Sequence, residues 1–218
     1  LGYVRGIDRW AAVQSLIDFW SHALCAAAFI GLLIWRVAEF RRHDQKLLLA
    51  GFAVTACWAW ITAILPGEPL ANFAETARNF VWIGLLYSLS ASSDERQHGV
   101  RLVYAAVAAV LGFQVVADGL VMAMPGEAVE QTATLLRITA AAGSLVLVHN
   151  LYGQASPASR MNIGLAMLAL SLTWSYDLNL YTIAYLDSGL APDLLDWRGL
   201  IVGATRVGTT TPRRRRRG

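Results

Sequence analysis

The feature that most constrains this chain is an apolar stretch, residues 161–186, that contains a single acidic residue, Asp177. A helix needs ~20 mostly apolar residues to cross a bilayer, and this stretch is long enough. At helical spacing Trp174, Asp177 and Tyr181 share one face, so the acid lies between two aromatic rings. A carboxyl group at that depth is costly unless it faces the protein interior and finds a partner. The sequence therefore predicts a membrane helix whose acid pairs with another span.

Long apolar runs also occupy most of the remaining chain. Of the 218 residues 56% are hydrophobic and 15% charged, and the charged residues cluster between the runs. Because a soluble domain usually has about a quarter charged residues, a soluble helical bundle is the weaker alternative. We expect an all-α, polytopic membrane helix bundle. It would have six full spans and a truncated seventh, and the six are residues 13–35, 47–65, 73–90, 100–124, 132–152 and 161–186.

The basic residues of the loops predict the orientation of this bundle. The first loop carries four Lys or Arg residues, and the third and fifth loops carry Arg96 and Arg160. The second, fourth and sixth loops carry none before the next span begins. Loops rich in Lys and Arg usually remain in the cytoplasm, so we expect the N-terminus outside and the C-terminus inside.

Charged residues within the spans gather in the outer half of the predicted bundle. Most lie within one or two turns of the outer surface, at a rise of about 1.5 Å per residue. They can form buried ion pairs that fix helix register, or a polar pocket that opens outward and is lined by aromatic rings. Both interpretations remain open. The set comprises Asp18, Arg78, Asp118, Arg137, Asp177 and Arg198, with the rings of Trp174 and Tyr181.

Other chemistry has no sequence signal. The four histidines fall on different predicted elements without ligand spacing, so we expect no metal site. No nucleophile, zinc or phosphate-loop motif occurs, and we expect neither a catalytic residue nor a cofactor. The net charge of +3 includes five arginines in one terminal run, Arg213–Arg217, and does not indicate a nucleic-acid partner.

Residues 208–218 form a basic tail that differs in composition from the multi-helix region, residues 1–207. The tail arrives before the seventh apolar run is long enough to span. We expect it to reflect a truncation or a reading-frame artefact. The alternative is a basic segment that binds anionic lipid.

Several segments together resemble the membrane region of exosortase/PEP-CTERM-associated (PrsK-type) sensor histidine kinases. They are SHALCAAAFIGLL, ETARNFVWIGLLYSL, HNLYGQASPASR, the stretch around Asp177, and DWRGLIVGATRV. The resemblance implies a multi-pass protein of the bacterial inner (cytoplasmic) membrane, joined to a cytoplasmic kinase core. It further implies a homodimer when joined to that core, and a response regulator that governs exopolysaccharide genes as partner. Past Val207 no residue matches the kinase core, so no catalytic residue carries over.

The first functional hypothesis is accordingly a membrane-embedded signal-input module. A stimulus at the outer face would shift helices that have two stable packing arrangements. The alternative is a small multi-pass transporter or channel subunit, for which the outer charges would line a path. A membrane enzyme is a third possibility, disfavoured by the missing motifs.

Overall fold

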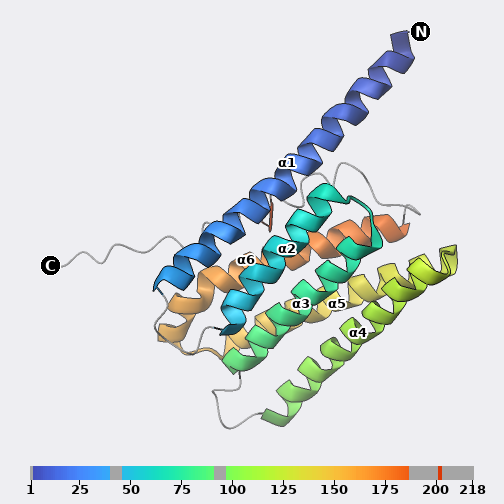
Figure 1. Cartoon of the computed structure of the whole chain (residues 1–218). Coiled ribbons are helices and arrows are strands. Elements are labelled where there is room, and N and C mark those ends of the chain that lie inside the picture. The colour runs from blue at the N-terminus through green and yellow to red at the C-terminus, as the bar shows by residue number, and fades with distance from the viewer. Residues whose placement is uncertain (1, 40–45, 91–96, 187–200, 203–218) are drawn as a thin grey trace.

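The structure is a computed structural model, and it describes residues 2–39, 46–90, 97–186 and 201–202. These residues are almost wholly helical, and no strand occurs among them. Six helices follow one another along the chain (Figure 1): α1 (Gly2–Glu39), α2 (Lys46–Ile64), α3 (Pro69–Ser90), α4 (Gln97–Ala123), α5 (Glu127–Gln154) and α6 (Pro157–Leu186). The predicted all-α class is confirmed.

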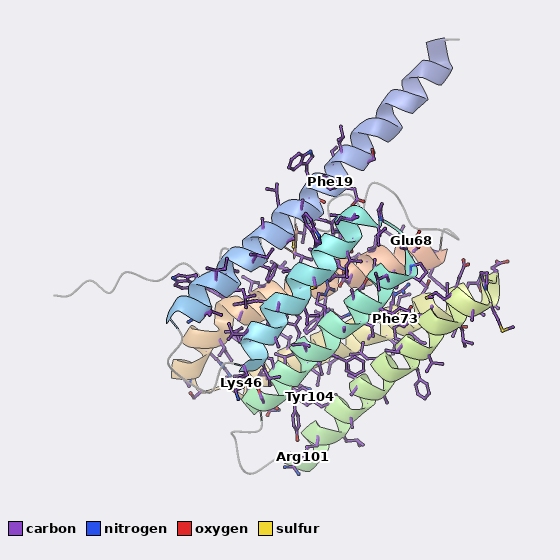
Figure 2. All side chains as sticks on the ribbon, viewed as in Figure 1. Phe19, Lys46, Glu68, Phe73, Arg101 and Tyr104 are labelled. Carbon is purple, nitrogen blue, oxygen red and sulfur yellow. The ribbon has the colours of Figure 1, made fainter. Side chains whose placement is uncertain are left out.

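The helices form a bundle in which each packs beside the next one in the chain, and α3 also contacts α5. Short turns at residues 65–68 and 124–126 join α2 to α3 and α4 to α5. Both turns lie at one end of the bundle, which we call the polar end, and the first turns of α1 extend past the other helices there (Figure 1). Figure 2 places Glu68 at the polar end, with Lys46, Arg101 and Tyr104 at the opposite end.

Four helices are long and apolar enough to cross a membrane: Ser15–Val37 within α1, Lys46–Ile64, Arg101–Ala123 within α4, and Glu127–Gln154. Each also presents large apolar side chains on its outer surface, such as Leu24, Trp60, Phe113 and Val146, which suit a lipid environment. The predicted spans at these four places are therefore supported by the structure.

Helices α3 and α6 are 22 and 30 residues long, but polar side chains interrupt their apolar sequence. Their assignment as spans stays a prediction, as does the orientation of the bundle. The predicted seventh span lies outside the described residues except for Ile201 and Val202, which are helical. The basic tail at 208–218 lies outside them too.

All six helices begin earlier than the predicted spans, and α3 and α5 do so at the two short turns of the polar end. Helix α3 starts at Pro69, where the fixed φ of proline suits the first helical position. Helix α5 starts at Glu127, and its first turn carries Glu127 and Glu130, whose charges favour a helix N-terminus. The predicted turns were therefore too long. Glu75, which the predicted span 73–90 already contained, lies within α3.

A core of interlocking aromatic and aliphatic side chains holds the first three helices together. Phe52 lies 5.9 Å from Phe29 and 6.1 Å from Trp82, measured between ring centroids. The indole of Trp82 donates a hydrogen bond to Thr55 Oγ1 at 3.0 Å. A Cβ atom at Gly51 would lie 3.0 Å from the Trp82 ring, so glycine there lets α2 and α3 approach closely. This packing positions α3 for the contacts described next.

Candidate functional site

The partner of Asp177 is Arg78, on α3. Arg78 Nη2 lies 2.9 Å from Asp177 Oδ2, and both side chains are 2% exposed. The guanidinium carbon also lies 4.2 Å from the ring centroid of Trp58 on α2, in a cation–π contact. The expectation that an arginine from another helix pairs with Asp177 is confirmed.

Two further contacts join the same faces of α3 and α6. The indole of Trp174 donates to Asn79 Oδ1 at 3.3 Å. The hydroxyl of Tyr181 donates to the two carboxylate oxygens of Glu75, at 2.6 and 2.8 Å. Helices α3 and α6 are not among the pairs whose backbones pack closely. Long polar and aromatic side chains therefore bridge them.

A second ion pair joins α4 to α5. Arg137 Nη2 lies 2.6 Å from Asp118 Oδ1, with the arginine side chain 14% exposed and the aspartate 1%. Asp118 also accepts hydrogen bonds from Gln114 Nε2 at 2.8 Å and from Thr76 Oγ1 at 3.2 Å. The guanidinium carbon of Arg137 lies 5.5 Å from the ring centroid of Tyr181. Tyr181 thus connects the second ion pair to Glu75 and α3.

A third pair, within α1, lies at the edge of this arrangement. His22 Nδ1 is 2.9 Å from Asp18 Oδ1, with the histidine buried and the aspartate side chain 18% exposed. The His22 ring meets the Trp58 ring edge-on, with 5.6 Å between centroids. Among the described residues, contacts through His22 and Trp58 connect Asp18 to Arg78. Arg198, also predicted in this set, lies outside the described residues.

These contacts form two groups, one around Arg78 and Asp177 and one around Arg137 and Asp118, whose members line one cavity. Together they involve all six helices, and we call the two groups the polar network. It contains seven of the eight residues that the sequence singled out, Arg198 being the exception. It also contains residues that the sequence analysis missed: His22, Trp58, Glu75, Thr76, Asn79 and Gln114. A helical-face analysis of α3 could have found Glu75, because Glu75, Arg78 and Asn79 lie three and four positions apart.

The centre of the polar network is packed. Asp177, Trp174 and Tyr181 line a cavity in which the space open to the centre of a water molecule is about 10 Å³. That is about the minimum for one water. Gln114 Oε1 on the same wall is buried and has no hydrogen-bond partner in the described part of the chain. The cavity is therefore too small for a solute, and the side chains around it are packed as ion pairs and hydrogen bonds.

A wider opening lies next to the cavity at the polar end, and we call it the vestibule. Its volume is about 440 Å³, and it lies between α3, α4, α5 and α6. Arg137 lines both the vestibule and the inner cavity. Of the predicted residues that the structure describes, Arg137 alone lines the vestibule, whereas Trp174 and Tyr181 line the packed cavity, so the predicted aromatic-lined pocket stays a prediction.

No group of three or more His, Cys, Asp or Glu side chains that could hold a metal ion occurs among the described residues. No family model, curated protein or solved structure matches this chain.

Proposed function

We propose that this chain is a membrane-embedded signal-input module, as its resemblance to PrsK-type sensor kinases implies. The observation that carries the proposal is the bridging of α3 and α6 by polar side chains. Close backbone packing fixes one arrangement of two helices, whereas hydrogen bonds and ion pairs can be exchanged for others. A stimulus that binds one arrangement better would shift the population toward it.

The polar network gives such a shift a route through the bundle. Arg78 contacts both α2 and α6, and Tyr181 contacts both α3 and α5. A displacement of α6 therefore changes contacts on three other helices. By the resemblance, the output would pass to a cytoplasmic kinase core that acts as a homodimer on a response regulator.

A chimera tests the proposal. Residues 1–207 would be fused to the cytoplasmic core of a sensor kinase whose response regulator drives a reporter gene. Asp177→Asn and Arg78→Gln should each change reporter output several-fold, because they alter the balance between the two helix arrangements. Glu68→Gln is the matched control, since Glu68 lies at the polar end but outside the network. Unchanged output in both network variants, at normal membrane levels, would contradict the proposal.

The orientation has its own test, because the module requires the polar end outside and the kinase inside. Fusions to a protein that fluoresces only in the cytoplasm should be bright after Gln97 and Ser159. They should be dark after Pro69 and Gly126, at the two turns of the polar end. A bright fusion at either turn would reverse the orientation and remove the vestibule from the outer face.

The transporter or channel subunit remains the second candidate, because ion pairs inside membrane helices also mark ion pathways. Flux measurements in proteoliposomes separate it from the first. Solute or ion flux that Asp118→Asn abolishes would favour transport, whereas a protein that seals the vesicles would favour signal input.

A further inference from the structure

The vestibule has the size of a small-molecule site. Ligand pockets usually measure about 300–1,000 Å³, and the vestibule, at about 440 Å³, lies in this range. Its wall combines apolar residues with polar ones, as such sites do. The polar lining residues are Asn72, Glu127, Glu130, Gln131, Thr134, Arg137 and Tyr185.

Helix α5 supplies most of these polar residues from one face. Glu127, Glu130, Gln131, Thr134 and Arg137 recur at helical spacing, so they form a stripe along the vestibule wall. The stripe is acidic at the start of the helix and basic at its inner end. At about 1.5 Å per residue, the backbones of Glu130 and Arg137 are about 10 Å apart along the axis. The wall therefore presents opposite charges to the two ends of a ligand.

Arg137 is placed to bind an anionic group that enters the vestibule. Its side chain is partly exposed, and a guanidinium has five N–H donors that suit carboxylate or phosphate oxygens. Among the described residues its polar partner is Asp118. If a ligand drew Arg137 away, Asp118 would keep its hydrogen bonds from Gln114 and Thr76. The buried carboxylate would then lose its ion-pair partner and keep two neutral donors.

The acidic start of α5 offers the complementary half of the site. Glu127 and Glu130 are exposed, and Glu127 Oε1 accepts a hydrogen bond from Gln131 at 3.1 Å. Carboxylates in this setting attract an ammonium group. A purely anionic ligand would be repelled by them, and a purely cationic one would be repelled by Arg137.

We propose that the vestibule binds a zwitterion whose carboxylate or phosphate contacts Arg137 and whose ammonium group contacts Glu127 and Glu130. The ligand would thereby compete with Asp118 for Arg137. A free ω-amino acid and the head group of phosphatidylethanolamine share this chemistry. The inference names the ligand class of the proposed signal-input site, but binding can be measured whether or not the chain signals.

Thermal unfolding of the purified protein in detergent tests the free ligand. The probes are 4-aminobutyrate, butyrate and butylamine at equal concentration and ionic strength, so that they differ only in their charged ends. The zwitterion should raise the unfolding midpoint by about 2–4 °C, and the other two should not, because a ligand stabilises only the state that binds it. An equal rise with butyrate or with butylamine would overturn the proposal.

Unfolding of the protein in nanodiscs tests whether the ligand is a lipid head group. The protein in phosphatidylethanolamine should unfold at a higher temperature than in phosphatidylglycerol, which has an anionic head group without an ammonium. A rise with this lipid alone would assign the site to the head group, and a rise with 4-aminobutyrate would assign it to a free solute. No rise in either arm would overturn the proposal.

Substitutions test whether the rise in the unfolding midpoint comes from binding in the vestibule. Arg137→Gln should abolish the rise. The double substitution Glu127→Gln with Glu130→Gln should also abolish it, and it changes exposed residues, so folding should be preserved. Glu68→Gln, outside the vestibule lining, should keep it. Retention of the effect in the double variant would overturn the proposal. If the chimera bound the zwitterion but its reporter output never changed, the proposed signalling function would be contradicted and the proposed binding site would stand.

Discussion

The two ion pairs that join separate helices use the same chemistry in different surroundings. Arg78 on α3 and Asp177 on α6 are both 2% exposed, and the guanidinium of Arg78 lies against the ring of Trp58. Arg137 and Asp118 come from the adjacent helices α4 and α5, and the arginine side chain is 14% exposed beside the vestibule. We call the first the closed pair and the second the open pair.

The difference lies in what remains when one partner is removed. Asp118 has two other hydrogen-bond donors, from Gln114 and Thr76, so its carboxylate keeps neutral hydrogen bonds when the open pair separates. Arg78 is buried, and its Nη1 atom has no hydrogen-bond partner among the described residues. Loss of Asp177 would leave that guanidinium charge largely uncompensated. The closed pair is therefore the one whose disruption costs more unfolding free energy, and the open pair is the one that a ligand could reach.

Asp177→Ala should give the largest effect. Stranding one member of a buried pair costs about 3–5 kcal/mol of unfolding free energy, and water access in a membrane reduces that figure. Asp177→Asn should cost less, because the amide oxygen can still accept from Arg78. Unfolding in mixed detergent micelles measures both. Asn179→Ala, an exposed change two residues away, is the control, and equal stability of Asp177→Ala and the control would contradict the closed pair.

A double-mutant cycle sharpens this first comparison. Arg78→Met should be milder in the Asp177→Ala background than alone, with a coupling above about 1 kcal/mol, whereas Arg137→Met should add independently. Coupling of Asp177 to Arg137 instead of Arg78 would mean that the pairs are assigned wrongly.

Tyr181→Phe should have the next largest effect. The hydroxyl bonds the buried carboxylate of Glu75, and hydrogen bonds to charged groups contribute about 1.5–3 kcal/mol. The ring that contacts Arg137 is kept, so the substitution separates the link to α3 from the link to the open pair. Tyr185→Phe, on the same helix and 42% exposed, should be neutral in the same unfolding assay. Equal losses in the two variants would exclude a specific role for the Tyr181 hydroxyl.

Arg137→Gln should cost less than either, about 1–2 kcal/mol, because Asp118 retains two donors and the arginine is partly exposed. The measurement is the same unfolding titration, with Arg78→Gln as the matched variant of the closed pair. If Arg137→Gln proved as costly as Arg78→Gln, the distinction between open and closed pairs would fail.

Asp18→Asn should have the smallest effect, about 0.5 kcal/mol or less. The aspartate side chain is partly exposed, and pairs near solvent contribute little. His22 Nδ1 also lies 3.0 Å from the backbone carbonyl oxygen of Asp18, a contact that the substitution leaves in place. A loss as large as that of Tyr181→Phe would place Asp18 inside the network instead of at its edge.

The boundaries of these helices show where local sequence patterns were insufficient. The apolar runs located all six helices, but the predicted spans left residues 66–72 and 125–131 as turns. In the structure proline and glutamate begin helices there, at Pro69 and Glu127. That error hid the acidic start of α5, so the vestibule could not be anticipated. Glu75 lay inside the predicted span 73–90 and was left out of the predicted polar set all the same.

The sequence by itself determined that Asp177 must have a partner, because a carboxyl group is too costly to leave alone among apolar helices. It did not determine that the partner is Arg78, which is 99 residues away. Arg78 and Arg137 both lie in spans at similar predicted depth, and helical periodicity cannot choose between them. The tertiary structure made that choice, because Gly51 lets α3 pack closely on α2 and Trp58 then orients Arg78 toward α6. An ion pair between residues far apart in the sequence forms only where two helix faces meet, and the packing of the whole bundle decides which faces meet.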